Sequence, residues 1–405
     1  MKKKIILFFV GLLSRLHILT PIQAKRKRLF YFIWLVLYCL LTPVGSFAQD
    51  WTDAVSVKKE LIRAANNGQT YYSQYNFYNP KNSGSLNSGY GRVLQCQPQI
   101  YGVDFHYASG TWYRPKRVRN ARENLVKIVK DSWRERRAIA CFSWHLENPY
   151  VPSKFPTTAG FRYINNKQNP DYPVEHQYVI KEILENSGDV CGMGNVSGKD
   201  NAKGYNTPRE WFEDRCKEVA DIINEFVDDN GHPIPIIFRL WHEWEDSWMW
   251  WGAKYVSAED YKRFFILTEQ TIMKYAPNAQ ILWAYCSDRY WNTEEKYLER
   301  FPGDAYVDII GFDDYLIGLS EKNLRAAVNR AAIVSRIAQE RNMASALFET
   351  NNNKRQVPEY YTKHLNRMLT SEDVHLGIVQ IWSLNNFNDS VDLKSFVNQK
   401  NIIVE

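Results

Sequence analysis

Two glutamates directly follow apolar runs that are typical of buried strands. Glu243 closes the segment 236–243 (IIFRLWHE), and Glu349 closes the segment 346–349 (ALFE), 106 residues further on. Paired carboxylates carry out glycoside hydrolysis, in which one protonates the leaving oxygen and the other attacks the anomeric carbon or activates water. A single glutamate in such a place is commonly an ordinary exposed residue, so it is the pair that favours this chemistry.

The loop after Glu243 is rich in tryptophan. Segment 244–252 (WEDSWMWWG) contains four Trp residues, a density that core packing alone does not explain, and aromatic rings stack on the apolar faces of sugars. An H-E-x-x-H metal site is excluded because no second His follows at helical spacing. The chain also lacks the G-x-S-x-G elbow of serine hydrolases. We therefore expect neither a metal nor a cofactor.

Strand-like runs alternate with amphipathic helix patterns after residue 50. The helix patterns are clearest at 207–228, 258–275, 321–341 and 358–370. The strand candidates are 70–76, 100–105, 138–144, 234–241, 281–286, 307–312, 345–348 and 378–382. Eight such units predict an α/β fold, a (β/α)8 TIM barrel forming a single domain over 49–405. A doubly wound open sheet is the alternative, but no Gly-rich phosphate loop follows the first strand.

The helix pattern at 207–228 has a well-marked start. Thr207 is expected to cap it, Pro208 suits the first helical position, and Glu210 completes a capping box. Apolar residues then recur at helical spacing along one side of the segment.

In a barrel, the residues just past the strand ends gather at one face and form the active site. This rule produces a shortlist of candidate site residues. They are Asp104, Trp144, His145, His242, Glu243, Asp313, Tyr315, Glu349 and Trp382.

The formal net charge of +6 comes from the N-terminal segment. Residues 1–48 hold eight Lys or Arg and no acidic residue, and without them 43 basic residues face 45 acidic ones. The remaining chain is close to neutral and gives no electrostatic reason to expect nucleic-acid binding. Aromatic residues make up 15% of the chain, which suits either a large core or a sugar-binding surface.

Residues 1–48 are predicted to be a signal peptide or targeting segment. The basic run 25–28 precedes the apolar run 29–41, and small residues stand before Gln49. This apolar run is short for a membrane span. We expect an exported protein, periplasmic or extracellular, without stable membrane insertion after cleavage. An uncleaved anchor is the alternative.

Five cysteines follow residue 48, and none of their spacings resembles a zinc site. Cys191 and Cys216 flank a polar, Gly-rich loop and could form a disulfide. The alternative is that the cysteines are free buried thiols.

Several blocks of the chain match one known family. The pattern R-x-x-H-E followed by W-x-W-W-G stands here at 239–243 and 248–252. It is accompanied by Ser143-Trp144-His145 with Asn148-Pro149, by segment 307–315 (VDIIGFDDY), by the strand ending at Glu349 and by Trp382. Together these blocks resemble glycoside hydrolase family 26, the β-mannanase family of the 4/7 superfamily of (β/α)8 barrels, over essentially the whole chain after residue 48.

The resemblance implies a role for each matching residue. Glu243 would be the general acid/base and Glu349 the nucleophile of a retaining enzyme, with carboxylates about 5 Å apart. The substrate-binding roles would fall to Arg239 beside the nucleophile, Tyr315 hydrogen-bonded to it, His145 and His242 on sugar hydroxyls, and Trp248 and Trp382 as walls of the cleft.

Other positions depart from the family pattern or are expected to be structural. Many members carry Met-Asn-Gly after the acid/base, whereas this chain has Trp244-Glu245-Asp246, so the aglycone-side floor of the cleft is expected to differ. Ser383 stands where some members carry an Arg that reaches a distal sugar. Trp250 and Trp251 are expected to pack in the core, and Asp314 to be a solvated loop residue.

The implied activity is that of a secreted retaining hydrolase of β-1,4-mannosidic linkages in mannan, galactomannan or glucomannan. Its partners would be β-mannan polysaccharide or mannooligosaccharides. The alternatives are a β-1,3-xylanase or mixed-linkage β-glucanase of the same family, or a non-catalytic glycan-binding barrel. The long segment 146–206 should rise beside His145 and narrow the cleft, which would favour short products such as mannobiose.

Overall fold

The computed structural model describes residues 51–81, 85–86, 88–109, 115–149, 178–188, 204–245, 249–352, 357–382 and 387–405. The predicted targeting segment lies outside these residues, so its boundary and the single-domain assignment stay predictions. Within the described part of the chain, no helix has both the length and the apolar character needed to cross a bilayer.

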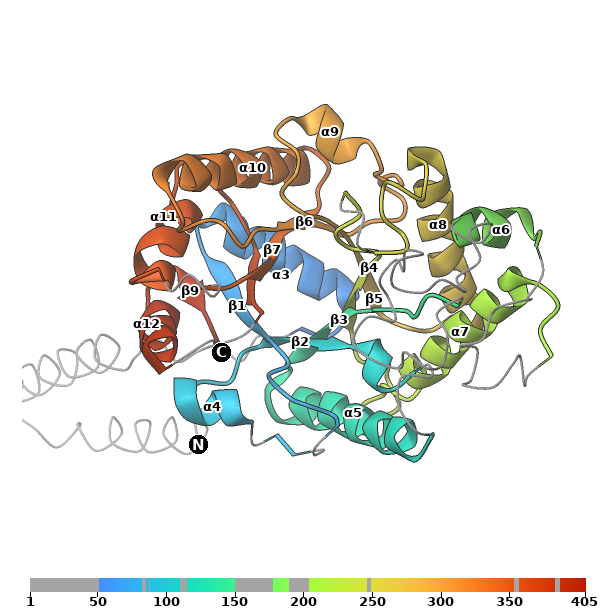
Figure 1. The fold of residues 1–405 in the computed structure, drawn as a ribbon. Coiled ribbons are helices and arrows are strands. Elements are labelled where there is room, and N and C mark those ends of the chain that lie inside the picture. The colour runs from blue at the N-terminus through green and yellow to red at the C-terminus, as the bar shows by residue number, and fades with distance from the viewer. Residues whose placement is uncertain are drawn as a thin grey trace, which may run out of the picture. The chain divides into compact units, whose positions relative to one another are not determined.

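Eight parallel strands close into a barrel (Figure 1). They are β1 (Thr70–Tyr75), β2 (Ile100–Asp104), β3 (Ile139–Ser143), β4 (Ile236–Leu240), β5 (Ile281–Ser287), β6 (Ile309–Asp313), β7 (Ala344–Thr350) and β8 (Ile378–Ile381). Each strand pairs with its successor, and β1 pairs with both β2 and β8, which closes the ring. The predicted (β/α)8 barrel is confirmed, and the open doubly wound sheet is wrong.

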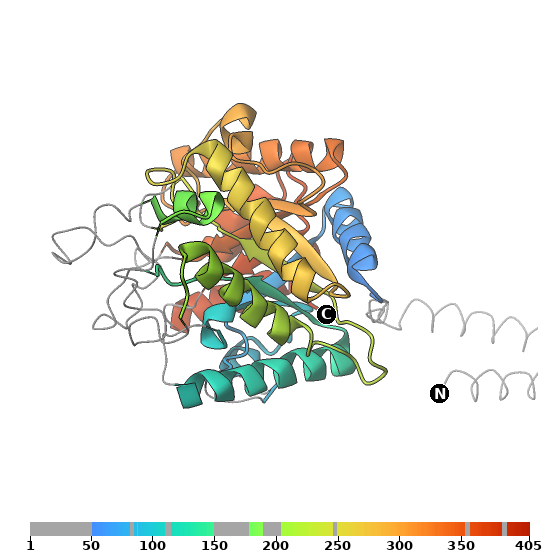
Figure 2. The ribbon, with the colours of Figure 1, turned by 90° about the vertical axis from the view of Figure 1, so that its right-hand side faces the viewer.

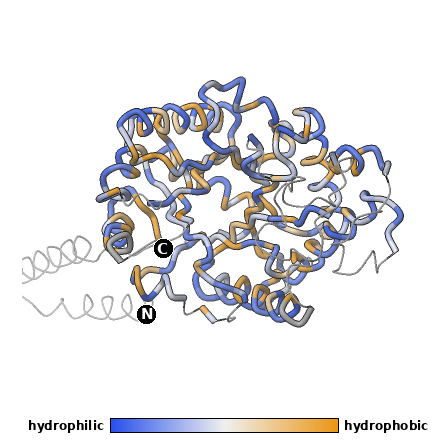
Figure 3. The backbone as a smooth tube through the Cα atoms, viewed as in Figure 1, coloured by the Kyte–Doolittle hydropathy of each residue, from blue (hydrophilic) through white to orange (hydrophobic). Residues whose placement is uncertain are grey.

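Helices surround the barrel. They are α3 (Ala54–Asn66), α4 (Gly89–Leu94), α5 (Pro115–Arg136), α6 (Val179–Glu185), α7 (Pro208–Ile223), α8 (Ala258–Tyr275), α9 (Glu294–Leu298), α10 (Glu321–Glu340), α11 (Asn366–Leu369) and α12 (Phe387–Val397). Figure 2 shows α5, α7 and α8 in succession along the outside of the sheet. In Figure 3 hydrophobic and hydrophilic stretches alternate along the helices. The helices therefore bury one side against the strands.

The start of α7 largely follows the prediction. The hydroxyl of Thr207 accepts the N–H of Glu210 at 3.3 Å, and Pro208 stands in the first turn. The Glu210 carboxylate accepts the N–H of Asn206 at 2.6 Å rather than that of the cap residue, so the predicted capping box is wrong in this detail. The helix ends at Ile223, before the predicted boundary, because Val227 forms an antiparallel bridge with Pro233.

The helix predicted at 358–370 begins in a less regular way. Residues Tyr360–Leu365 form a π-helix that continues into α11. The Asp392 carboxylate accepts the N–H groups of Tyr361 and Thr362 at 2.7 and 3.3 Å. This side chain from α12 satisfies donors at the start of the helical segment, which has no preceding turn to pair with.

A polar side chain joins the strands where the ring closes. Gln380 on β8 accepts a hydrogen bond from Ser73 on β1 at 2.9 Å and donates one to the carbonyl of Phe348 on β7 at 3.0 Å. Gly102 on β2 leaves the room for it, because a Cβ there would lie 2.6 Å from the Gln380 oxygen. The barrel is thus closed by buried hydrogen bonds as well as by strand pairing.

Candidate functional site

The strand ends bring most of the predicted site residues together. Arg239, His242 and Glu243 come from β4 and the residues after it, and Tyr315 and Glu349 from the ends of β6 and β7. Asp313, a strand-end candidate to which the resemblance assigns no role, lies beside Arg239, Glu243 and Glu349. His145 follows β3 and packs its ring against that of His242, with centroids 4.7 Å apart. Trp248 lies outside the described residues.

The end of β7 is irregular, and this irregularity places Glu349. Phe312 on β6 pairs with Leu347, but the next residue, Asp313, pairs with Glu349, so Phe348 is skipped. A β-bulge of this kind changes the direction of the side chains that follow it. The pairing brings Glu349 level with Asp313.

Glu349 is held by two donors and is buried. Arg239 and Tyr315 each donate a hydrogen bond to its carboxylate, one to each oxygen. The Nε2 atom of His242 lies 3.8 Å from the same oxygen that Arg239 contacts. Burial and the Glu349 charge raise the pKa of Tyr315 well above its ordinary value, so this phenol stays a proton donor. Both carboxylate oxygens of Glu349 are therefore held in place by donors.

Glu243 sits on strained backbone at the end of β4. Trp241 and Glu243 both adopt positive φ angles, 45° and 54°, a region that non-glycine residues rarely occupy. Such strain is retained where the surrounding structure determines it, often at functional sites. The Glu243 N–H donates to the carbonyl of Cys286 at 3.3 Å, which ties this turn to β5.

The two glutamates face each other closely. One carboxylate oxygen from each of Glu243, Asp313 and Glu349 lies within 4.8 Å of those from the other two. This short separation suits a retaining arrangement, because an inverting enzyme needs a wider gap to hold a water molecule.

The three carboxyl groups differ in the hydrogen-bond donors that reach them. Arg239 donates to Asp313 at 2.8 and 3.1 Å and also to Glu349, whereas no described side chain donates to Glu243. Burial, followed by the negative charges of Glu349 and Asp313, raises the pKa of Glu243 well above its ordinary value. Although burial opposes its charge, the Asp313 and Glu349 carboxylates raise the pKa of Arg239 as well. Burial raises the pKa of Asp313 as well, but Arg239 opposes that rise, so Glu243 is the carboxyl group with the least support for its charge.

His242 is neutral in this environment. Burial, and next the Arg239 charge, lowers its pKa well below the ordinary value. Its Nδ1 atom is buried and has no hydrogen-bond partner among the described residues. A neutral imidazole with an unsatisfied nitrogen can bind a sugar hydroxyl without adding positive charge beside Glu349.

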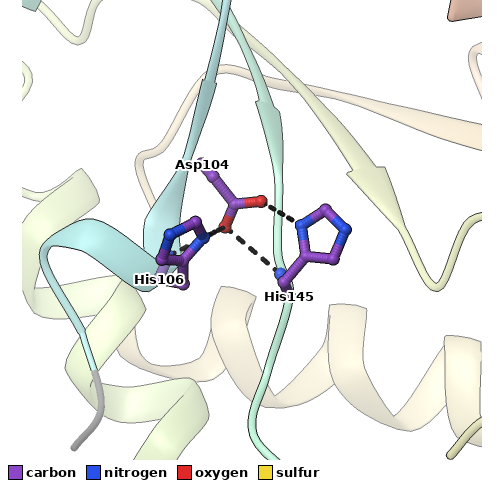
Figure 4. Close-up of side chains that lie close together, drawn as sticks. All are labelled: Asp104, His106 and His145. Carbon is purple, nitrogen blue, oxygen red and sulfur yellow. Dashed lines mark hydrogen bonds and ion pairs between the residues drawn. The ribbon is translucent and has the colours of Figure 1, made fainter. Parts of the chain in front are cut away.

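A second cluster joins β2 to the residues after β3 (Figure 4). The buried Asp104 carboxylate accepts the backbone N–H of His106 at 2.8 Å and that of His145 at 3.2 Å. It also contacts the Nδ1 atoms of both imidazoles. Burial alone would raise the pKa of Asp104, but the two histidines hold it well below its ordinary value.

Both clusters have the residue types of metal ligands. In Asp104, His106 and His145, as in Glu243, Asp313 and Glu349, the ligand atoms lie within 4.8 Å of one another. In the first set the Asp104 oxygens already accept hydrogen bonds, and in the second Arg239 supplies the positive charge. These donors and this positive charge already serve the carboxylates of both sets, so we invoke no metal ion. That the protein uses no metal or cofactor stays a prediction.

The ring of Trp382 packs on a partner that the sequence did not indicate. Its half-buried ring stacks on Tyr75, the last residue of β1, with centroids 3.8 Å apart and planes 15° from parallel. Trp250 and Trp251 are buried, and their indole N–H groups donate to the carbonyls of Leu146 and His242, both at 2.8 Å. Their predicted packing role is confirmed.

Two further residues that the sequence singles out have partners on other elements. Asp314 is fully buried and pairs with Arg330 from α10 at 2.5 Å, so its prediction as a solvated loop residue is wrong. Glu245, the departure after the acid/base motif, accepts the N–H of Asp288 at 2.7 Å, and burial raises its pKa to about 8. This glutamate links the loop after β4 to the loop after β5.

The cysteines in the described part of the chain are free thiols. Cys141, Cys216 and Cys286 are buried, and Cys96 is half-buried. Cys191, the candidate disulfide partner of Cys216, lies outside the described residues. The Cys286 thiol donates to the Asp313 carboxylate at 3.2 Å.

Comparison with known proteins gives a consistent result. The family model for glycosyl hydrolase family 26 matches residues 205–381. A mannan endo-1,4-beta-mannosidase of Bacillus subtilis (strain 168) is 26% identical over 224 residues, which is 54% of this chain and 50% of that protein. One of Bifidobacterium adolescentis is 34% identical over 143 residues, covering 34% of this chain and 14% of that protein. The chain thus spans half or less of the length of these relatives.

Solved structures share the fold. GH26C from a Muricauda species superposes with a TM-score of 0.67 at 21% identity, covering 86% of this chain and 92% of that one. A GH26 beta-mannanase from Bacteroides ovatus superposes with a TM-score of 0.64 at 20% identity, covering 86% and 94%.

Proposed function

Because the chain belongs to glycosyl hydrolase family 26, we propose that it hydrolyses β-1,4-mannosidic linkages in mannan, galactomannan or glucomannan with retention of configuration. The observation that carries the proposal is the close pair of carboxyl groups in unequal surroundings, because Arg239 and Tyr315 donate to Glu349 while no described side chain donates to Glu243. The mannosidase names of two relatives support the choice of substrate.

The reaction proceeds by double displacement on this pair. Glu243 protonates the glycosidic oxygen while a Glu349 oxygen attacks the anomeric carbon, and the leaving group departs. Glu243, now a carboxylate, then takes a proton from water, which attacks the glycosyl–enzyme ester and releases the sugar. Tyr315 and Arg239 hold the nucleophile in position.

The sugars lie along the mouth of the barrel. His145 and His242 bind hydroxyls near the cleaved bond, and the Trp382 ring, supported by Tyr75, stacks against a sugar face. Trp248, which lies outside the described residues, is proposed as a further aromatic contact for the substrate. The enzyme is exported by its N-terminal segment and meets polysaccharide or mannooligosaccharides outside the cytoplasm.

Release of reducing ends from a panel of glycans tests the substrate. The protein lacking residues 1–48 should act on linear mannan and galactomannan and leave β-1,3-xylan and mixed-linkage β-glucan intact. Activity on either of those two glycans in preference to mannan would replace the substrate assignment. Glycan binding without turnover would identify a non-catalytic barrel.

Azide rescue with an aryl β-mannoside tests the two carboxylate roles as a pair. In Glu349→Ala, azide takes the place of the nucleophile and should give an α-mannosyl azide. In Glu243→Ala, the glycosyl–enzyme still forms and azide should give the β-anomer. The two variants serve as each other's control, and the same anomer from both would contradict the assignment.

Early products on mannan test the length of the cleft. Within segment 146–206, helix α6 buries Val179, Ile180 and Ile183, and Arg209 of α7 donates to the Ile183 carbonyl at 3.2 Å, so this part is anchored. A wall built on it favours early accumulation of mannobiose. A broad ladder of mannooligosaccharides would show an open cleft instead.

A further inference from the structure

The donors to Asp104 divide into two sets, one on each oxygen. Oδ1 accepts the backbone N–H groups of His106 and His145 and lies 2.9 Å from Nδ1 of His106. Oδ2 accepts the hydroxyls of Ser143 at 2.7 Å and Tyr75 at 3.3 Å, and contacts Nδ1 of His145. A carboxylate that is surrounded by donors in this way is an acceptor only.

An acceptor at this place decides which nitrogen of His145 carries a proton. The nitrogen that faces a carboxylate is protonated, and the other nitrogen of a neutral imidazole then carries a lone pair. In Figure 4 the second nitrogen of His145 lies on the side of the ring away from Asp104. The ring of His242 stands nearly perpendicular to that of His145, with centroids 4.7 Å apart.

We propose that Asp104 is a positioning residue that holds His145 as the Nδ1–H tautomer, so that Nε2 presents a lone pair to a sugar hydroxyl. The first part concerns the protein alone. The second part rests on the proposed function, because it makes His145 an acceptor that reads a hydroxyl donor of the substrate.

The variant Asp104→Asn reverses this arrangement in a defined way. Backbone N–H groups cannot become acceptors, so the amide oxygen must take the place of Oδ1 and the NH2 group that of Oδ2. The hydroxyls of Ser143 and Tyr75 can rotate to accept, but Nδ1 of His145 can accept from the new NH2 group only when the ring proton is on Nε2. One isosteric change should therefore convert His145 from an acceptor to a donor at the cleft.

Imidazole nitrogen NMR on ¹⁵N-labelled protein tests the first part, with the His145 signals identified by their loss in His145→Gln. At neutral pH the wild type should show the Nδ1–H tautomer and Asp104→Asn the Nε2–H tautomer. Ser143→Ala removes one donor from Oδ2 without adding another and should keep the wild-type tautomer. An imidazolium or an Nε2–H tautomer in the wild type would overturn the proposal even if the variant failed to fold, as would an unchanged tautomer in folded Asp104→Asn.

Kinetics and binding test the second part. Asp104→Asn should raise KM for mannotetraose about 10-fold, the effect of one polar contact, with a smaller change in kcat. In the Glu349→Gln background the same substitution should weaken mannotetraose binding by a similar factor. A loss confined to kcat, or unchanged binding despite the altered tautomer, would contradict this part. Lack of any activity on mannan in the wild type would remove the proposed function but leave the tautomer result standing.

Discussion

Arg239 donates hydrogen bonds to Asp313 and Glu349, while no described side chain donates to Glu243. Three carboxyl groups this close and this buried cannot all ionise beside a single guanidinium. Burial raises the pKa of both Glu243 and Asp313, but Arg239 donates to Asp313 and not to Glu243, so we assign the proton to Glu243. Arg239 and Tyr315 donate to Glu349 but not to Glu243. At the residue scale, this difference assigns the nucleophile role to Glu349 and the acid role to Glu243.

The proton on Glu243 matters most when the leaving group is poor. Glu243→Ala should lower turnover of mannan about 10³- to 10⁴-fold, within the range of general acid catalysis. An aryl mannoside with an acidic phenol needs little protonation in the first step, so its glycosylation rate should change far less. Pre-steady-state release of the phenol measures this step, and an equal loss for both substrates would show that Glu243 is not the acid.

The charges around Glu243 should also set the alkaline limit of activity. The acid works only while protonated, so activity falls as pH rises through the pKa of Glu243. Burial and the Glu349, Asp313 and Asp288 charges raise that pKa, so Asp288→Asn should lower it and shift the alkaline limb of kcat/KM to lower pH. Asp304→Asn removes the same charge from a mostly exposed side chain and should leave the limb in place. A shift toward higher pH in Asp288→Asn would contradict the electrostatic account.

Sequence reasoning found the residues that directly follow strands but missed some of their supports. Tyr75 ends β1, yet only the folded barrel shows that its ring lies beneath Trp382. His106 stands in a short 3-10 turn after β2, where no periodic pattern marks it. Asp314 was expected to be solvated because nothing in its own segment shows that Arg330 approaches from α10. Such pairings depend on tertiary distances that local patterns do not contain.

At the scale of single elements, the strand ends are more distorted than an alternating pattern predicts. β4 stops at Leu240 because Trp241 turns into the left-handed region, and β7 skips Phe348 in its pairing with β6. Propensity favours neither feature, since bulky residues avoid positive φ. The existence and order of the elements were therefore predictable, whereas the bends that orient Glu243 and Glu349 were not.

The ends of the helices follow local rules more faithfully, and α7 offers a test. Thr207→Ala removes the hydroxyl that accepts the Glu210 N–H and should cost about 1 kcal/mol of stability. Thr207→Ser retains the acceptor and should cost little. Chemical unfolding of both variants measures the difference, and kcat should be unchanged because the cap lies outside the carboxylate cluster. An equal loss in both variants would attribute the effect to the Thr methyl group instead.

At the scale of the whole barrel, closure depends on polar contacts that hydropathy does not reveal. Strand β1 (TYYSQY) is fully buried, although its Thr, Ser and Gln side chains are polar. Ser73 and Gln74 make hydrogen bonds to Gln380 and to the Ile381 carbonyl, both at 2.9 Å. The first and last strands of the ring are thus joined by side chains as well as by backbone pairing.

Replacing Gln380 tests how much this contributes. Gln380→Leu would leave the Ser73 hydroxyl and the Phe348 carbonyl buried without their partner, at a cost of about 2 to 4 kcal/mol. The midpoint of denaturant unfolding measures the loss. Adding Ser73→Ala should recover part of it, because one of the two orphaned groups is then gone. A double variant no more stable than Gln380→Leu would assign the loss to packing.

The buried thiols allow the opening of the barrel to be followed chemically. Cys141 lies on β3, Cys216 on α7 and Cys286 on β5, and burial raises the pKa of Cys141 to about 12, so a thiol reagent reaches such groups only after local or global opening. With residues 1–48 removed and Cys96 and Cys191 replaced by Ser, three cysteines remain, and mass spectrometry of partly labelled protein would separate two modes of opening. Molecules carrying either no label or three labels indicate a barrel that opens as one unit, whereas single labels on Cys216 indicate that α7 detaches while the strands stay paired.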